Sequence, residues 1–335
     1  MTRVSQTDAD RSAAGDAPAA TGSAQRTARA QTVKRAVTRG PNAPSAKYWV
    51  YLAPAVAVFV LFLFFPLGQS VFLSFHGTNV FTREPTDFVG FDQYVQLFTD
   101  PSFRKVLVVT LGFVLMTVVP SIVIAVCLGL LLHQRVAGVR FFRSAYALPF
   151  AYSVATASVL FGAMYQPLTG IINSLLSYVG VGRIGWLTDP RWALISVSLA
   201  TVWMQLGYNL MIVSAGLGTV DDEIVEAARI DGARGLRMQT NILLPLITPQ
   251  IFFLVVTGTI SALQSFGQIH ILTQGQPLGA TTTLVYSIYL TAGFGASSAV
   301  PNYGFASAQA IVLLLIVILM TIVQFGVLER RVFYR

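Results

Sequence analysis

Five long stretches of this chain contain no Asp, Glu, Lys or Arg, and they constrain the fold more than any other feature. They are residues 48–82, 106–134, 144–182, 192–220 and 238–328. Each contains an apolar run long enough to cross ~30 Å of hydrocarbon as a helix, and the last contains two. The sequence therefore predicts six membrane-spanning helices, near residues 49–74, 106–132, 144–166, 193–218, 249–270 and 304–328.

Composition points to a membrane protein. Hydrophobic residues make up 54% of the 335 residues and charged residues only 11%, whereas about a quarter of a typical soluble domain is charged. A buried globular core would not require six such runs. The strands of a membrane β-barrel would alternate in polarity, which these runs do not. We therefore expect an all-α membrane protein.

The basic residues predict how the chain is oriented. Of the 22 Lys and Arg, 17 lie in the N-terminal tail, in the loop near 135–143, in the loop at 219–248 or at the C-terminus. Positive residues are enriched on the cytoplasmic side of membrane proteins. We therefore expect cytoplasmic N- and C-termini and a cytoplasmic loop at 219–248. The net charge of +8 then reflects orientation, and no nucleic-acid partner is needed to explain it.

Two regions differ in organisation. Residues 1–47 are rich in Ala, Thr, Arg, Ser and Gln without apolar periodicity, which predicts a disordered cytoplasmic tail that rests on anionic lipid. Residues 48–335 form the predicted membrane domain. The single cysteine, Cys127, lies inside the second predicted span, so neither a disulfide framework nor a thiolate metal site is expected.

The loop at 219–248 is a polar island between two apolar spans. Acidic residues at 221–223 precede a pattern of helical period, as at the start of a short helix. Gly232 can end that helix and allow a second to begin at an angle. Pro245 and Pro249 mark where the second helix stops and the next span begins. A solvated loop with two short amphipathic helices would explain the pattern by itself.

The same residues resemble a family motif, the EAA loop of binding-protein-dependent ABC importer permeases. The match is carried by Glu226-Ala227-Ala228, by Gly232 six positions after the Glu, and by Leu244-Pro245. Asp231-Gly232-Ala233 is similar to the carbohydrate and glycerol-phosphate branch. Gln239 and Leu236 depart from the family, which usually has aromatic residues there. The resemblance covers roughly residues 48–335 and is greatest to the first permease subunits of sn-glycerol-3-phosphate importers.

This resemblance implies a non-catalytic translocation subunit with a two-helix coupling loop. The residues implied to contact an ATPase subunit are Glu226, Ala227, Ala228, Asp231, Gly232, Ala233, Leu244 and Pro245. The implied partners are a second homologous permease subunit, two ABC ATPase subunits, an extracytoplasmic substrate-binding protein and membrane lipid. ATP and Mg²⁺ would be used by the ATPase partner in an inner-membrane complex, and we expect this chain to bind no cofactor and no metal.

Polar residues inside the fourth and fifth spans are candidates for a substrate pathway. Polar groups in hydrocarbon are costly unless they pair or face a cavity. Gln264 and Gln268 are four apart and share a helix face. Hydrogen bonding between helices explains any single polar residue equally well. The candidate pathway residues are Gln205, Tyr208, Asn209, Gln264, Ser265 and Gln268.

The sequence leaves the substrate open. The resemblance favours sn-glycerol 3-phosphate or glycerophosphodiesters. The predicted spans carry no Lys or Arg to meet a phosphate, so a neutral sugar or oligosaccharide is the alternative. An ion-coupled secondary transporter is the alternative from another class, although such proteins usually carry charged residues within the membrane. No metalloprotease, nucleophile-elbow or phosphate-loop motif occurs, so an enzyme is not expected.

Overall fold

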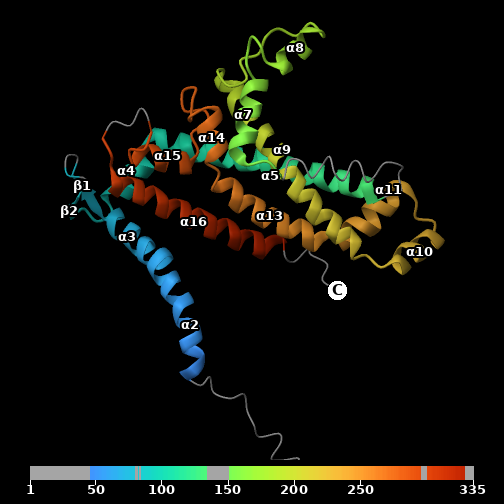
Figure 1. Ribbon diagram of the computed structural model, residues 1–335, viewed down its shortest axis with the longest axis horizontal. Helices are drawn as coiled ribbons and strands as arrows, with labels where there is room; N and C mark the ends of the chain where they lie inside the picture. The colour runs from blue at the N-terminus through green and yellow to red at the C-terminus, as the bar shows by residue number, and fades with distance from the viewer. Residues whose placement is uncertain (1–45, 80–81, 83, 134–150, 296–299, 329–335) are drawn as a thin grey trace, which may run out of the picture. The chain divides into compact units, whose positions relative to one another are not determined.

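The computed structural model describes residues 46–79, 82, 84–133, 151–295 and 300–328 (Figure 1). The chain divides into two units, Met1–Phe65 and Pro66–Arg335. The predicted tail at 1–47 falls almost entirely outside the described residues. In the first unit, α2 (Ala46–Phe59) continues into the π-helix η1 (Val60–Phe64). These helices expose bulky apolar side chains, such as Phe62 at 72%, as expected for a surface that meets lipid or another membrane helix.

The second unit is mostly helical but contains a small β-hairpin that the sequence analysis did not predict. After α3 (Phe65–Ser74), β1 (His76–Thr78) pairs antiparallel with β2 (Pro85–Phe88). The hairpin and the end of α3 are tied to α4 (Asp92–Thr99), because Gln93 Nε2 donates to His76 O at 2.5 Å and Tyr94 donates to Ser74 Oγ at 2.7 Å. These hydrogen bonds hold the short strands, which lack a larger sheet.

Four long helices form the body of this unit. They are α5 (Pro101–His133), α9 (Pro190–Gly218), α13 (Thr248–Leu263) and α16 (Tyr303–Leu328). α5 packs against α9 and α13, and α13 packs against α9 and α16. Several of their buried hydroxyls bond within their own helix; Thr117 donates to Phe113 O at 2.7 Å and Thr201 to Val197 O at 2.8 Å. Such local bonds allow small polar residues inside an apolar bundle.

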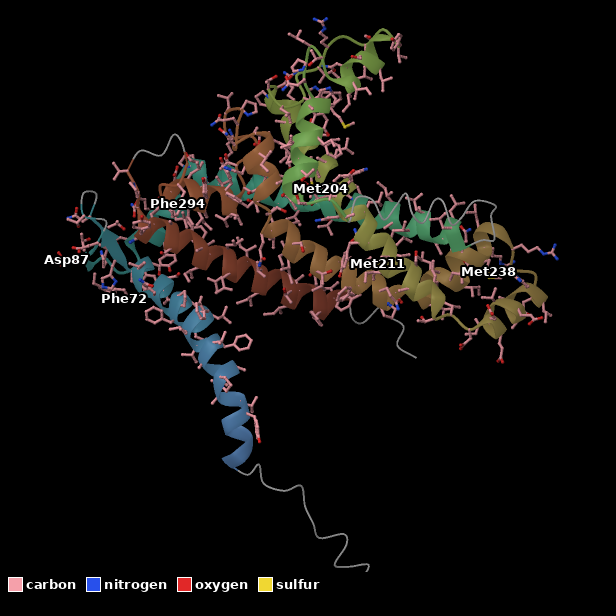
Figure 2. All side chains as sticks on the ribbon, viewed as in Figure 1. Phe72, Asp87, Met204, Met211, Met238 and Phe294 are labelled. Atoms are coloured by element: carbon pink, nitrogen blue, oxygen red, sulfur yellow. The ribbon has the colours of Figure 1, made fainter. Side chains whose placement is uncertain are left out.

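Short helices flank this bundle. α7 (Val154–Met164) packs against α14 (Gly267–Leu272), and α15 (Leu284–Thr291) packs against α16. α8 (Ile171–Ser177) lies in the loop between α7 and α9. The loop after α9 contains α10 (Asp222–Ile230), α11 (Gly235–Met238), the π-helix η2 (Gln239–Leu243) and α12 (Leu244–Leu246). Met238 and Phe294 lie near opposite ends of this unit (Figure 2).

The helices match most of the predicted spans. In the described residues, four helical segments are long and apolar enough to cross a membrane: Tyr51–Ser74, Pro101–Leu132, Pro190–Gly218 and Tyr303–Val327. If the bent pair Gly235–Leu246 and Thr248–Leu263 counts as one span, the number of candidate spans is five. The third predicted span, 144–166, is described only from residue 151 and includes the short α7. The rest of that span lies outside the described residues.

The fifth predicted span is not one continuous helix, which corrects the expectation for 249–270. α13 ends at Leu263, residues 264–266 are not helical, and α14 begins at Gly267. The Phe266 ring packs against His270, Tyr286 and Tyr289, with ring centroids 4.9–5.8 Å away. These contacts with α14 and α15 hold the chain in its non-helical path after Leu263.

Candidate functional site

The predicted coupling loop forms two helical segments joined at a glycine. Asp221 occupies the N-cap position of α10, and the acidic residues Asp222 and Glu223 lie in its first turn, where they suit the positive end of the helix dipole. After Asp231, Gly232 adopts a φ of +83°, which favours glycine because other residues clash there. The predicted turn between two short helices is therefore confirmed at Gly232.

The first segment is anchored in the bundle by its alanines. Ala228 and Ala233 are each 7% exposed and belong to the same buried cluster as Leu217 of α9 and Leu130 of α5. The backbone N–H of Ala233 donates to Ala228 O at 2.9 Å across the turn. These two alanines therefore connect the loop to the buried cluster that the long helices share.

The second segment leads directly into the bundle. α11, η2 and α12 run without interruption from Gly235 to Leu246, and a bend of 66° then separates them from α13. Ile247, with a φ of −98° and a ψ of 11°, occupies the bend. Leu244 packs on the core cluster, and Thr248 Oγ1 donates to Pro245 O at 2.6 Å. A single bend at Ile247 thus connects this segment to α13.

The outward face of the loop combines charge with apolar side chains. Ile230 is 82% exposed and Leu236 is 77% exposed. Ala227 is exposed beside them. The exposed charged residues of the loop are Asp221, Asp222, Glu223, Glu226, Arg229, Asp231, Arg234 and Arg237. Apolar anchors within a charged surround are typical of a protein-docking surface.

The predicted pathway residues of α9 are at least half-buried. Asn209 is 6% exposed, and Gln205 and Tyr208 are half-buried. Gln205 Oε1 accepts a hydrogen bond from Ser121 of α5 at 3.5 Å. The aromatic ring of Tyr208 packs against the core cluster. The Gln205 bond is of the helix-to-helix kind that was the alternative to a substrate contact.

The other three predicted pathway residues lie at the break between α13 and α14. Gln264 is exposed, whereas Ser265 and Gln268 are 9% and 5% exposed. Ser265 Oγ donates to Ser261 O at 3.1 Å, back into the last turn of α13. In membrane proteins, non-helical backbone at depth is tolerated where protein buries it or where it lines a water-filled cavity. The break therefore makes the environment of Gln264 a candidate binding position.

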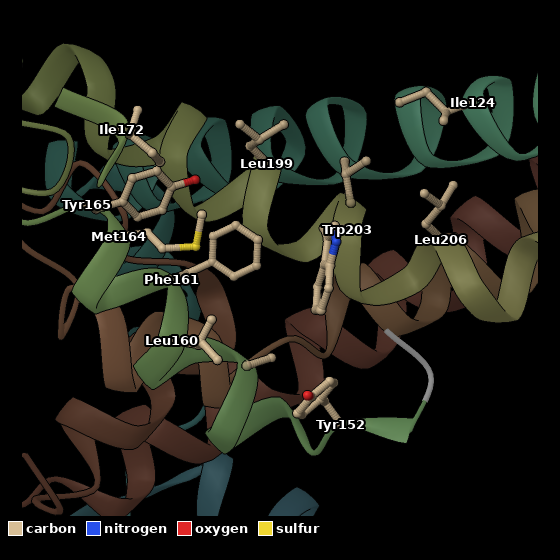
Figure 3. A pocket seen from close by; sticks show the side chains of 12 residues that line it. Ile124, Tyr152, Leu160, Phe161, Met164, Tyr165, Ile172, Leu199, Trp203 and Leu206 are labelled. Atoms are coloured by element: carbon tan, nitrogen blue, oxygen red, sulfur yellow. The ribbon is translucent and has the colours of Figure 1, made fainter. Parts of the chain in front are cut away.

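A pocket of about 610 Å³ lies beside α9 (Figure 3). Trp203 faces it between Phe161 and Tyr152, with ring centroids 5.4 and 6.4 Å away. Tyr165 closes one end, and its hydroxyl donates to Ser196 O at 3.0 Å. Sequence reasoning did not select this pocket. Two aromatic residues one helical turn apart, Phe161 and Tyr165, could have indicated an aromatic pocket. The third aromatic residue, Trp203, is too distant in sequence to be assigned to the same pocket without a structure.

The described residues offer no group of three or more His, Cys, Asp or Glu placed to hold a metal ion. Near the break, His270 and Tyr286 belong to the aromatic cluster around Phe266. Burial, and secondarily the neighbouring Tyr289, raise the pKa of the Tyr286 phenol. The phenol therefore keeps its proton near neutral pH.

Sequence comparison identifies related proteins over most of the chain. Residues 98–334 match the family model described as binding-protein-dependent transport system inner membrane component. The sn-glycerol-3-phosphate transport system permease protein UgpA of Brucella suis biovar 1 (strain 1330) is 36% identical over 286 residues, covering 84% of this chain and 94% of that protein. The lactose transport system permease protein LacF of Rhizobium radiobacter is 32% identical over 292 residues, covering 84% and 94%.

Solved structures share the fold. A chain from the crystal structure of a bacterial ABC transporter involved in the import of the acidic polysaccharide alginate superimposes with a TM-score of 0.73 at 23% identity, covering 90% of this chain and 99% of that one. A chain of the bacterial alginate ABC transporter in complex with an alginate pentasaccharide-bound periplasmic protein gives a TM-score of 0.72 at 24% identity, covering 84% and 94%. At these identities the similarity concerns the fold.

Proposed function

The chain belongs to the family of binding-protein-dependent transport system inner membrane components, and we infer that it forms half of the translocation pathway for sn-glycerol 3-phosphate or glycerophosphodiesters. It is a multi-pass inner-membrane permease subunit of a carbohydrate-type ABC importer. This membership leaves no support for the ion-coupled secondary transporter. The substrate and the roles of individual residues are the proposed part.

The observation that carries the proposal is the packing of the coupling loop into the bundle. Ala228 and Ala233 share one buried cluster with residues of α5, α9 and α13, while Glu226 and Asp231 face outward. A force applied to the outward face therefore acts on the long helices through packed contacts. Such a segment can couple the inward- and outward-facing states of a membrane cavity to the open and closed states of a partner protein.

The proposed mechanism places the chemistry of ATP on other subunits. Two ABC ATPase subunits bind ATP with Mg²⁺ and close, and a cleft in one of them receives α10 with Glu226, Ala227, Gly232 and the residues around them. The closure tilts α9 and α13 and turns the cavity from inward- to outward-facing. A second homologous permease subunit forms the other half of the pathway, and an extracytoplasmic binding protein delivers the substrate.

This mechanism requires an orientation that the basic residues support. If the chain has six spans with cytoplasmic termini, the loop at 219–248 lies on the cytoplasmic side, where the ATPase subunits bind ATP. The clustering of Lys and Arg in the tail, this loop and the C-terminus follows the rule for cytoplasmic segments. The third span would comprise residues 144–166, including α7.

The pathway is proposed to run past the polar residues of α9 and the break between α13 and α14. These residues are Gln205, Tyr208, Asn209, Gln264, Ser265 and Gln268. Amides and hydroxyls can bind the hydroxyls of a glycerol or a sugar, and a helix end can meet a phosphate. A neutral sugar is the second candidate, because the spans predicted from the sequence carry no Lys or Arg and a relative is a lactose permease.

Uptake by the complete transporter in proteoliposomes tests the proposal. The vesicles contain this chain, its partner permease, the ATPase subunits and the binding protein. We expect ATP-dependent uptake of radiolabelled sn-glycerol 3-phosphate and of a glycerophosphodiester, and none of lactose. Uptake of neutral sugar alone would select the second candidate. Solute movement through this chain without an ATPase subunit would overturn the assignment of the coupling loop.

A further inference from the structure

A row of exposed apolar side chains lines the loop between α7 and α9. Leu168, Ile171 and Leu175 follow helical spacing into α8, and Tyr178 and Val179 continue the row beyond its end. Their exposed fractions run from 55% at Ile171 to 89% at Tyr178. Contiguous apolar surface of this kind is uncommon where a protein meets water. An environment other than water is therefore expected over this row.

The loop presents this row from a rigid frame. Asn173 is 5% exposed, and its Nδ2 donates to Pro167 O at 3.2 Å and to Ile184 O at 2.9 Å. Its Oδ1 accepts from Ile184 N at 3.3 Å and from Trp186 Nε1 at 2.9 Å. These four bonds use the hydrogen-bonding capacity of the amide. The loop is thus closed on a buried asparagine with its apolar side chains outward.

Other polar groups of the loop are also satisfied internally. The hydroxyls of Ser174 and Ser177 donate to Gly170 O at 3.1 Å and to Ser174 O at 2.6 Å. After α8, the N–H groups of Gly180 and Val181 donate to Ser177 O and Leu176 O, both at 3.1 Å. In water, solvent molecules can hydrogen-bond such groups. A loop in contact with lipid has no such solvent, so its polar groups must be paired within the protein.

The distribution of charge separates an apolar zone from a cationic border. Residues 166–182 contain no Asp, Glu, Lys or Arg. The exposed Arg183 follows directly, and the exposed Arg191 lies in the first turn of α9. The apolar surface continues on α9 at Ile195 and Leu199, which are 43% and 55% exposed. Apolar side chains beside an aromatic and bordered by Arg are typical of a segment at the bilayer interface.

We propose that α8 and the turn after it insert into the interface of a phospholipid bilayer, where they form a lipid-binding edge beside the pathway. Leu175 and Val179 contact acyl chains, Tyr178 lies at the headgroup level, and Arg183 meets lipid phosphates. The loop leads into α9, which is long and apolar enough to cross a membrane, so the end of the loop lies close to that interface. The proposal depends on the membrane location of the chain and is independent of the transported substrate.

Fluorescence quenching in nanodiscs containing the complete transporter tests this edge. Cys127 is replaced by Ser, and single cysteines at Leu175 or Val179 are labelled with an environment-sensitive dye. Thr82, an exposed residue of the hairpin loop, serves as the aqueous control site. Each labelled variant is first checked for assembly with its partner subunits and for transport. Nanodiscs expose both faces of the membrane, so the result does not depend on orientation.

We expect spin-labelled lipid to quench the dye at 175 and 179, and iodide to quench it at least about threefold less than at 82. Replacing Arg183 by Glu in these variants should weaken the lipid quenching in anionic bilayers. Iodide quenching equal to that at 82 would overturn the proposal, because the row would then face water. Protection from both quenchers would also overturn it, because a protein partner would then cover the row.

Discussion

Gln324 of α16 donates a hydrogen bond from Nε2 to Thr259 Oγ1 of α13 at 2.8 Å, and both side chains are buried. Thr259 Oγ1 in turn donates to Val255 O at 2.7 Å. Gln324 Oε1 is buried without a described partner. A buried side-chain hydrogen bond therefore links α13 to α16.

Thr259→Val should destabilise the protein more than the double variant Thr259→Val/Gln324→Leu. The single change leaves Nε2 of Gln324 unpaired in an apolar environment, which costs about 1 kcal/mol. The second change removes that unpaired amide. Thermal unfolding of the purified transporter in detergent measures both. Thr257→Val is the matched control, because Thr257 bonds within its own helix to Phe253 O. A double variant less stable than Thr259→Val would contradict this account.

Gly216→Ala should destabilise the junction between α9 and α13. A Cβ at position 216 would lie 2.7 Å from Cγ and 2.8 Å from Cδ of Gln250, so packing must shift at a cost of about 1–3 kcal/mol. Gly218→Ala is the control, since nothing lies within 4 Å of its added Cβ. Thermal unfolding should separate the two variants, and Gln250→Ala should recover part of the loss. Equal stability of the Gly216 and Gly218 variants would refute the close approach.

The sequence was sufficient to locate the structural elements that are determined by residues within a single segment. Long charge-free runs predicted α5, α9 and α16 because crossing hydrocarbon depends on the composition of one segment. Gly232 predicted the turn after α10, since a positive φ favours glycine. Pro245 and Pro249 bracket the bend at Ile247, as their placement predicted.

Features that depend on distant residues could not be found in this way. The break after Leu263 has no proline at it, and Phe266 is held there by Tyr286 and Tyr289. A Cβ at Gly267 would approach Val154 of α7 to 3.1 Å, a contact between segments far apart in the chain. The pocket around Trp203 likewise combines residues from 124 to 206. The candidate pathway residues were chosen by polarity alone, and their role stays a prediction.

Substitutions at Gly232 should lower coupling in a fixed order. Its φ of +83° is tolerated best by Asn among non-glycine residues, less well by Ala, and is incompatible with Pro. No atom lies within 4 Å of an added Cβ, so the backbone alone sets the order. Uptake per ATP hydrolysed should fall from Gly through Asn and Ala to Pro. Normal uptake in the Gly232→Pro variant would exclude a rigid turn as the coupling element.

Glu226→Lys should uncouple ATP hydrolysis from uptake while the protein stays in the membrane. The side chain is exposed opposite the buried Ala228, so reversal of its charge disturbs a partner contact and leaves the fold intact. We expect uptake to fall by roughly tenfold with ATPase activity retained. Glu84→Lys makes the same charge change on the hairpin loop and should leave uptake unchanged. If both variants behave alike, net charge is the cause and the proposed contact fails.

Gln264→Leu should impair uptake without a loss of stability. Gln264 lies at the end of α13, where its side chain is exposed and the backbone leaves the helix. Removing the amide deletes a donor and an acceptor from the proposed pathway, but no buried partner is left unsatisfied. A lost hydrogen bond to substrate is worth about 0.5–1.5 kcal/mol, which predicts a several-fold rise in the half-saturating substrate concentration. Gln96→Leu on the exposed face of α4 is the matched control. A lower melting temperature for Gln264→Leu with unchanged uptake kinetics would assign this amide to packing, and the pathway would have to run elsewhere.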